Sequence, residues 1–334
     1  MNKPILYMLV GLPASGKSTW ANEHRGFYRY PDKDYTWWFS SDIIRQANNL
    51  KDNNKVFNIV HKKVFAALER GDNAIYDATN ISRKRRIAFL KELEQKKIDC
   101  EKICILFLTP VHLCKKRNAE RTGNAKVPED VIDRMLRQFQ LPMMSEGWDE
   151  VRIETSQIDT VFEFSAWVKE FGYSKMEIFG GKVDMEQENE HHNLTLVEHQ
   201  KHTAMWAATL GKPIFSDYDI MEILFKAARY HDIGKLWTKT KTEGDANAHY
   251  YAHENVGAYE FLIFLLMSKS DDVFKVRKDV ISDEEYIAAL LINWHMRPYV
   301  WEKNPHIIEK DKKMFDGRFY MLLQILHEAD KEAH

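Results

Sequence analysis

The segment at residues 11–18 reads Gly-Leu-Pro-Ala-Ser-Gly-Lys-Ser and follows the apolar run Ile5–Val10. The run predicts a strand, and a helix is expected to begin near Lys17. In a glycine-rich turn between a strand and a helix, successive backbone N–H groups point at a phosphate, and the helix terminus adds positive charge. Lys17 would then reach the β- and γ-phosphates of a nucleoside triphosphate such as ATP, and the Ser18 hydroxyl would bind Mg²⁺. The expected nucleotide-binding residues are Gly11, Ala14, Ser15, Gly16, Lys17, Ser18 and Thr19.

A carboxylate and an arginine follow the second expected strand, Trp37–Ser40. Because ligands of open α/β sheets bind at the carboxyl ends of the strands, Asp42 and Arg45 should lie beside the phosphate loop. Asp42 could accept the proton of a hydroxyl that attacks the γ-phosphate, and Arg45 could hold a neighbouring phosphate. An aspartate before a helix is also a common N-cap, and that role alone is the alternative for Asp42.

Polar residues also follow the expected strand Ala74–Tyr76, at the same edge of the sheet. Asp77, Thr79 and Asn80 could bind the molecule that accepts the phosphate, or they could serve only the turn at the strand end. The basic run Arg83–Arg86 comes next. It suits contact with a polynucleotide backbone, and it suits an ordinary solvated helix start equally well.

Two arginines, Arg117 and Arg121, lie four residues apart on an expected helix and should therefore share one face. They precede the segment Thr122–Lys126, which is expected to be a loop. An arginine-bearing lid that closes over a triphosphate would stabilise the charge on the transferred phosphoryl group. The alternative is a solvated basic helix face.

The C-terminal half carries a second pattern of reactive residues, which begins with His231-Asp232-Ile-Gly-Lys235 at the end of an apolar helix. Imidazole nitrogens and carboxylate oxygens are the usual ligands of catalytic divalent metals. Further candidates lie on other expected helices, as is typical of ligands that converge inside a helical bundle. They are His199, His253, His295 and Asp330. Each histidine alone could be a core residue, but the ordered set predicts a metal site.

The elements that must position these residues change in character along the chain. Strands are expected at Ile5–Val10, Trp37–Ser40, Ala74–Tyr76, Ile103–Leu108 and Val151–Ile153, with helices between them, which predicts a parallel α/β sheet. Beyond an expected helix at Asp159–Phe171, the strand signals fade. Helices are expected at Thr195–Leu210, Asp219–His231, His253–Ser268, Asp283–Trp294 and Arg318–Lys331. We therefore expect an α/β domain at 1–172, a linker at 173–190 and an all-α domain at 191–334.

Length, composition and charge narrow the class of protein. The 334 residues suffice for two domains, no apolar stretch approaches a membrane span, and the N-terminal apolar run is too short for a signal peptide. The three cysteines lack metal-type spacing, which favours a reduced, cytoplasmic compartment. Residues 1–150 carry 26 lysines and arginines against 19 acidic residues, whereas residues 151–334 carry 22 against 31. The basic half could hold a polyanion.

The motifs of the first half resemble those of the 5′-hydroxyl polynucleotide kinases of nucleic-acid repair, over nearly all of residues 1–155. The matching segments are 11–18, Ser41-Asp42-x-x-Arg45, Asp77–Asn80, Arg117-x-x-x-Arg121 and Val127–Glu129. The resemblance implies that Asp42 is the general base for a 5′-hydroxyl and that Arg45 contacts the 3′-phosphate of the acceptor. It also implies that Lys17, Arg117 and Arg121 contact the donor phosphates.

The second half, roughly residues 191–334, resembles the HD phosphohydrolase superfamily in the order of its histidines and aspartates. The resemblance implies one divalent metal on His199, His231, Asp232 and Asp330. It implies a second metal on His253 and His295, with Asp232 as the bridge and Lys235 at the substrate phosphate. Because the set is rich in imidazole, transition metals are expected there rather than Mg²⁺.

A 5′-end kinase fused to a metal-dependent phosphoesterase suggests the healing of RNA or DNA ends. One domain would phosphorylate a 5′-hydroxyl, and the other would remove a 3′-phosphate or a 2′,3′-cyclic phosphate. Known bifunctional proteins that pair the two modules are similar, although in those the HD module comes first. Two alternatives remain at this point: a kinase of a small molecule or modified nucleobase fused to an HD nucleotidase, and a regulatory module with a degenerate HD site.

Overall fold

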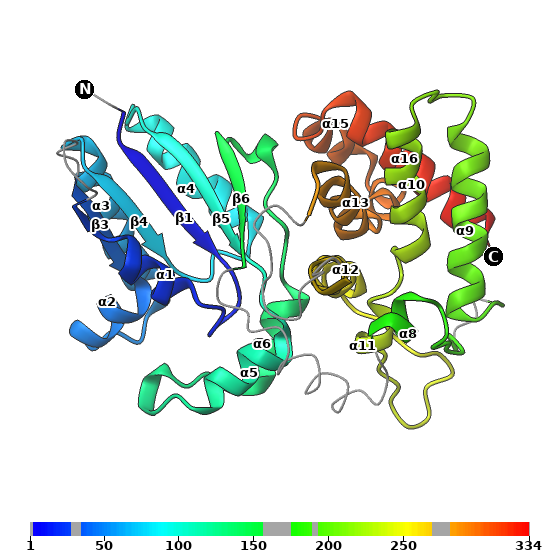
Figure 1. Ribbon diagram of the computed structural model, residues 1–334, viewed down its shortest axis with the longest axis horizontal. Coiled ribbons are helices and arrows are strands. Elements are labelled where there is room, and N and C mark those ends of the chain that lie inside the picture. Colours follow the sequence, from blue (N-terminus) through cyan, green and yellow to red (C-terminus); the bar gives the residue numbers. More distant parts are fainter. Residues whose placement is uncertain (1–2, 28–34, 156–174, 189–192, 269–280, 334) are drawn as a thin grey trace. The chain divides into compact units, whose positions relative to one another are not determined.

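The computed structural model describes residues 3–27, 35–155, 175–188, 193–268 and 281–333 (Figure 1). The chain divides into two compact units. The first unit contains Met1–Met135 and Pro142–Ile158, and the second contains Leu136–Leu141 and Asp159–His334. No helix among the described residues is both long and apolar enough to span a lipid bilayer.

Six strands form one sheet in the first unit. They are β1 (Ile5–Val10), β2 (Gly26–Phe27), β3 (Tyr35–Ser40), β4 (Asn73–Asp77), β5 (Glu101–Phe107) and β6 (Glu150–Glu154). Their order across the sheet is β2-β3-β4-β1-β5-β6, and every neighbouring pair is parallel except β2 and β3. The parallel α/β sheet expected from the sequence is confirmed, and the short strand β2 extends it at one edge.

Helices cover both faces of this sheet because its central strands are apolar on both sides. The helices of the first unit are α1 (Lys17–His24), α2 (Ser41–Ala47), α3 (Asn53–Glu69), α4 (Arg83–Gln95), α5 (Val111–Ala119) and α6 (Glu129–Arg137), whose last two residues fall in the second unit. On one face, Trp20 of α1 packs into a cluster with Leu9 and Ile105. On the other face, Phe89 of α4 lies 5.1 Å from Tyr76 of β4 and 5.1 Å from Phe65 of α3, between ring centroids.

The basic run Arg83–Arg86 does not form one surface. Arg86 is fully buried and makes a two-pronged ion pair with Glu146, with nitrogen–oxygen distances of 2.6 and 2.8 Å. Its third nitrogen donates to the backbone carbonyl of Asn80. Arg86 therefore anchors the turn after β4 and is withdrawn from any polynucleotide backbone, whereas Lys84 and Arg85 are exposed.

The described part of the second unit contains helices and one isolated antiparallel bridge, between Thr240 and His249, but no strand. Its α-helices are α8 (Lys175–Phe179), α9 (Leu196–Gly211), α10 (Tyr218–Tyr230), α11 (Lys235–Thr238), α12 (His253–Ser268), α13 (Asp283–Trp294), α14 (Arg297–Lys303), α15 (Ile308–Lys312) and α16 (Gly317–Glu332). Side-chain caps set several starts: Thr195 with Glu198 at α9, and Ser282 with Glu285 at α13, form capping boxes. The all-α character expected for this half is confirmed, and the helix expected at Asp159–Phe171 lies outside the described residues.

The segment expected to be a linker, residues 173–190, differs from that expectation where it is described. Phe179 of α8 is buried and stacks on Phe264 of α12, with ring centroids 4.3 Å apart. Gln187 is also buried, and its backbone carbonyl accepts a hydrogen bond from the Tyr250 hydroxyl. These residues belong to the packed interior of the second unit rather than to a solvated connection.

A short excursion of the chain, Leu136–Leu141, also belongs to the second unit. Phe139 is buried there and contacts Tyr259 of α12 at 5.0 Å between ring centroids. The side chain of Asn293 in α13 accepts a hydrogen bond from the N–H of Leu141 and donates one to the carbonyl of Phe139. The chain therefore enters the second unit, returns to the first for β6, and enters the second unit again.

Candidate active sites

A cavity of about 560 Å³ opens at the carboxyl edge of the sheet in the first unit. β3 and β4 end there in register, since Ser40 pairs with Asp77, and β1 ends beside them. Most of the residues expected to bind nucleotide or acceptor line this cavity. They are Ala14, Ser15, Gly16, Lys17, Ser18, Thr19, Asp42, Arg45, Asp77, Thr79, Arg117 and Arg121.

The phosphate loop has the backbone that its sequence predicts. A Cβ atom on Gly11 would lie 2.7 Å from Oγ of Ser15 and 3.0 Å from Cβ of Phe107, so the first glycine is required by close packing. Gly16 has φ 98°, in the left-handed region, and α1 begins at the next residue. Gly11 lies behind the loop and does not line the cavity, so its part in nucleotide binding is to shape the turn.

The Lys17 ammonium is buried inside the loop. It donates to the carbonyls of Gly11 and Leu12, at 3.0 and 2.6 Å, and to Oγ of Ser15 at 3.2 Å. Burial lowers the pKa of Lys17, and the carboxylate of Asp77 acts against that shift. A cation held by only two carbonyls and one hydroxyl is well placed to bind an anion that enters the loop.

Asp77 occupies a different place from the one expected for an acceptor-binding group. Its Oδ2 accepts hydrogen bonds from the Ser18 hydroxyl at 2.8 Å and from the indole N–H of Trp38 at 3.0 Å. Burial raises the pKa of Asp77, while Lys17 and these two donors oppose the shift. The structure therefore places Asp77 with the phosphate loop, on the nucleotide side of the cavity.

The side of the cavity that is expected to bind the acceptor is formed around α2. Asp42 lies exposed in the first turn of this helix, and Arg45 lies at its end. The N-cap role is taken by Ser40, whose hydroxyl accepts from the N–H of Ile43, so capping does not account for Asp42. Arg45 donates to the side chain of Asn53 at 2.8 Å.

Asn80 is not brought into the cavity with Thr79. Its side-chain amide donates to the carbonyl of Leu9 at 2.9 Å, and its backbone has a left-handed φ of 45°. Asparagine tolerates this conformation better than most residues, so the turn reading of Asn80 accounts for its position.

Positive charge dominates the cavity. Five lysine or arginine side chains line it (Lys17, Arg45, Arg85, Arg117 and Arg121), against two carboxylates. α5 ends at Ala119, so Arg121 lies just beyond the helix that carries Arg117 rather than on it. Arg85 of the basic run Arg83–Arg86 also lines the cavity, and two further lining residues, Asn53 and Phe57, were not expected. Asn53 and Phe57 lie one turn apart on α3 without any motif to mark them.

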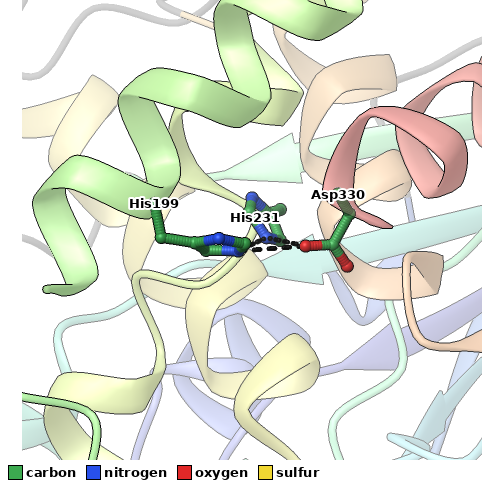
Figure 2. Close-up of side chains that lie close together, drawn as sticks. All are labelled: His199, His231 and Asp330. Carbon is green, nitrogen blue, oxygen red and sulfur yellow. Dashed lines mark hydrogen bonds and ion pairs between the residues drawn. The ribbon is translucent and has the colours of Figure 1, made fainter. Parts of the chain in front are cut away.

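In the second unit, three of the expected metal ligands meet in the interior. His199 on α9 and His231 at the end of α10 face Asp330 on α16 (Figure 2). Oδ1 of Asp330 lies 3.0 Å from Nε2 of His199 and 3.2 Å from Nε2 of His231, and the two Nε2 atoms are 3.3 Å apart. All three side chains are buried.

The remaining ligands form a second triad beside the first. Oδ1 of Asp232 lies 3.0 Å from Nε2 of His253 and 3.6 Å from Nε2 of His295, and these two nitrogens are 3.0 Å apart. The other oxygen of Asp232, Oδ2, lies 3.4 and 3.5 Å from the nitrogens of His231 and His199. The carboxylate of Asp232 therefore faces both triads.

The donor chemistry of the cluster fits divalent cations. Nδ1 of His231, His253 and His295 each lies within 2.8 Å of a backbone carbonyl three residues earlier, which favours a proton on Nδ1 and directs Nε2 into the cluster. Two bare Nε2 atoms at 3.0 Å repel each other unless a cation or proton lies between them. Each triad can thus hold a metal, with imidazole nitrogens that suit transition metals.

The electrostatics of the cluster also favour the binding of a cation. Burial alone would lower the pKa of His231, but the carboxylates of Asp232 and Asp330 raise it to about 10. Burial alone would also raise the pKa values of both carboxyl groups, but Lys235 beside Asp232 and His231 beside Asp330 hold them well below their usual range. The site thus holds two ionised carboxylates that favour positive charge.

Two further side chains contact the carboxylates. The Lys235 ammonium lies 2.6 Å from Oδ2 of Asp232 and donates to the side chain of Gln187 at 2.8 Å. The Tyr299 hydroxyl donates to Oδ2 of Asp330 at 2.8 Å, opposite the histidine-facing oxygen. Lys235 was expected from its motif. Gln187 and Tyr299 were not, because nothing in the local sequence marks them.

Gly234 permits the close approach of the turn after α10 to the start of α12, which brings Asp232 and His253 of the second triad together. A Cβ atom there would overlap the carbonyl oxygen of His253 and lie 2.6 Å from the backbone nitrogen of Gly257. We expect Gly234→Ala to destabilise the second unit by about 1–3 kcal/mol, since overpacking forces backbone shifts of that size. We also expect it to lower bound metal, because Asp232 and His253 must move apart. Denaturant unfolding and elemental analysis measure the two effects.

Gly317→Ala is the matched control, because a Cβ atom at Gly317 meets nothing within 4 Å. It should leave both the unfolding midpoint and the metal content unchanged. Equal behaviour of the two variants would show that the contact between Gly234 and α12 does not hold the second triad in place.

Comparisons with known proteins find partial matches to this chain. Residues 6–142 match the family model AAA_33, described as an AAA domain. L-seryl-tRNA(Sec) kinase of Methanococcus maripaludis is 27% identical over 164 residues, which are 46% of this chain and 60% of that protein. Transcription factor bHLH140 of Arabidopsis thaliana is 26% identical over 167 residues, 47% of this chain and 16% of that protein. The chain spans less than two thirds of either relative.

Two solved structures show partial likeness. A chain of the Pnkp1/Rnl/Hen1 RNA repair complex is 27% identical, with a TM-score of 0.34, over 41% of this chain and 44% of that chain. A fungal RNA kinase is 15% identical, with a TM-score of 0.36, over 53% of this chain and 46% of that chain. From its own sheet, loop and family match, the first unit has the α/β fold of P-loop kinases.

Proposed function

We propose that the chain is a bifunctional enzyme that heals RNA or DNA ends. Its first unit would phosphorylate 5′-hydroxyl ends from ATP or another nucleoside triphosphate, and its second unit would be an HD-type phosphohydrolase. The proposal rests on how the structure brings distant residues together. Expected kinase residues from positions 17 to 121 line one cavity. Six expected metal ligands from positions 199 to 330 form one buried cluster. Chance core histidines do not arrange themselves around two carboxylates in this way.

In the kinase reaction, Asp42 would take the proton of the 5′-hydroxyl. The hydroxyl oxygen bonds to the γ-phosphorus while the bond from that phosphorus to the β–γ bridging oxygen breaks, and a nucleoside diphosphate leaves. Lys17, Arg117 and Arg121 would stabilise the charge on the transferred group. Ser18 and Asp77 are the residues that would hold Mg²⁺, which neutralises phosphate charge when bound.

Two features support a nucleic-acid end as the acceptor. Arg45 and Arg85 add positive charge on the Asp42 side of the cavity, beyond what a single transferred phosphate requires. A curated relative that is 27% identical over 164 residues is named L-seryl-tRNA(Sec) kinase, and that name describes a group carried by an RNA as the substrate.

In the proposed hydrolysis, water adds to the phosphorus of a 3′-terminal phosphate. The bond to the 3′-oxygen breaks, and the products are a 3′-hydroxyl and inorganic phosphate. One or two divalent transition metals, held by the His199–His231–Asp330 and Asp232–His253–His295 triads, would activate water and offset phosphate charge. Lys235 would contact the substrate phosphate, and Tyr299 orients Asp330 through its hydrogen bond.

End labelling tests the proposal. ATP labelled at the γ-phosphate is incubated with 5′-hydroxyl RNA and DNA oligonucleotides and Mg²⁺. Oligonucleotides that end in a 3′-phosphate or 2′,3′-cyclic phosphate are assayed with Mn²⁺ or Ni²⁺. We expect label on the 5′ end and loss of the 3′-terminal phosphate. Transfer to nucleosides or sugars but to no oligonucleotide would overturn the end-healing proposal in favour of a small-molecule kinase. Metal binding without any hydrolysis would favour a regulatory second unit.

A further inference from the structure

Phe57 is the one aromatic side chain among the described residues that line the cavity of the first unit. It lies in α3, is half-buried, and the guanidinium of Arg85 is 5.7 Å from the centre of its ring. The ring cannot bind phosphate or Mg²⁺, the groups that Lys17, Ser18 and Asp77 are expected to hold in the same cavity. It is suited to a planar, uncharged group.

The position of Phe57 assigns it to the acceptor side of the cavity. Asn53, one helical turn earlier, binds Arg45 at 2.8 Å, and Arg45 shares α2 with Asp42. On the side expected to bind the nucleotide, Asp77 at the end of β4 accepts a hydrogen bond from Ser18 of the phosphate loop and interacts electrostatically with Lys17. A ring beside Arg45 therefore belongs with the molecule that brings the hydroxyl to Asp42.

We propose that Phe57 is the stacking platform for the base of the nucleoside whose 5′-hydroxyl is phosphorylated, and that Arg85 holds its ring by a cation–π contact. This inference rests on the proposed kinase function and names the part of the acceptor that is recognised. Base stacking on an aromatic ring tolerates every base, because each has a π face. The terminal base must also be free to leave a duplex, so single-stranded or overhanging 5′ ends are the preferred acceptors.

The test compares two oligonucleotides that differ only in the presence of the 5′-terminal base. For the wild-type protein, kcat/KM should be roughly 5- to 150-fold higher for the oligonucleotide that carries the 5′-terminal base than for the abasic one. This range corresponds to the contribution of one stacked base. Phe57→Ala should abolish most of that preference, by lowering kcat/KM on the base-bearing end while leaving the abasic end nearly unchanged. Phe57→Trp should retain it.

Trp37→Ala is the matched control, because Trp37 is a partly exposed aromatic residue of the same unit that does not line the cavity. It should keep the full preference for the base. A Phe57→Ala variant that merely misfolds would lose activity on both ends alike and would lower the unfolding midpoint. Unchanged preference in a folded Phe57→Ala variant would overturn this inference alone. A wild-type protein that phosphorylates neither oligonucleotide would overturn the proposed kinase function, and the inference with it.

Discussion

Asp42→Ala is expected to lower phosphoryl transfer to a 5′-hydroxyl oligonucleotide by about 10²–10⁴-fold, the usual contribution of a general base. Asp42 is exposed at the start of α2 and lines the cavity, and the N-cap of that helix is Ser40, so the substitution removes a proton acceptor without removing the cap. ATP binding should be nearly unchanged, since Lys17 and Ser18 are intact. Steady-state kinetics and nucleotide titration measure the two quantities separately.

Asp52→Ala provides the control for Asp42→Ala. Asp52 caps the neighbouring helix α3 through the N–H of Asn54 and does not line the cavity. Its loss should cost about 1 kcal/mol of helix stability and leave transfer near the wild-type rate. If Asp42→Ala transfers phosphate as fast as Asp52→Ala, another group takes the proton.

Asp232→Ala should remove the 3′-phosphatase activity and most of the bound transition metal, because this carboxylate is the one group that faces both triads. Phosphorylation of 5′ ends with Mg²⁺ and ATP should persist, since Asp232 lies in the second unit and the kinase residues lie in the first. Elemental analysis of protein purified without chelator should give more than one transition metal per chain for wild type, and well below one for this variant.

A double variant, His253→Ala with His295→Ala, separates the two metal positions. It removes two ligands of the second triad and leaves the first triad and Asp232 in place, so the metal content should fall toward one. Content that stays above one would show these histidines to be structural. For the Asp232→Ala variant of the previous paragraph, loss of both phosphorylation and phosphatase activity in a folded protein would mean that the two reactions share one site.

The parts of the molecule that the sequence could predict are those with local signals. The phosphate loop is contiguous, so its glycines, Lys17 and the start of α1 follow from spacing alone. Five of the described helices of the second unit, α9, α10, α12, α13 and α16, follow from apolar periodicity, and the order of histidines and aspartates marks the expected ligands on them. The expectation that Asp232 bridges two metals came from the family resemblance. It is consistent with the two carboxylate oxygens, since Oδ2 faces His231 and Oδ1 faces His253.

What the sequence could not predict depends on packing between distant segments. Phe57 reaches the cavity because α3 packs beside α2, and Tyr299 reaches Asp330 from another helix, 31 residues away in sequence. Residues 173–190 are polar enough to suggest a linker, yet Phe179 and Gln187 find buried partners in the second unit. Asp77 has the residue type of an acceptor ligand, and only its hydrogen bond to Ser18 places it with the nucleotide.

The path of the chain between the two units determines how the two proposed activities can be studied separately. Leu136–Leu141 belong to the second unit, where Leu136, Phe139 and Leu141 are buried, although the residues on both sides belong to the first. A fragment that ends at residue 172 would contain Phe139 without Tyr259. A fragment that begins after residue 172 would contain Tyr259 without Phe139. Burial of one phenylalanine contributes about 1.5–3 kcal/mol, a large share of the stability of a small domain. Loss of activity in a fragment could therefore result from this missing core contact alone. Each activity should be assigned with point substitutions in the whole 334-residue chain.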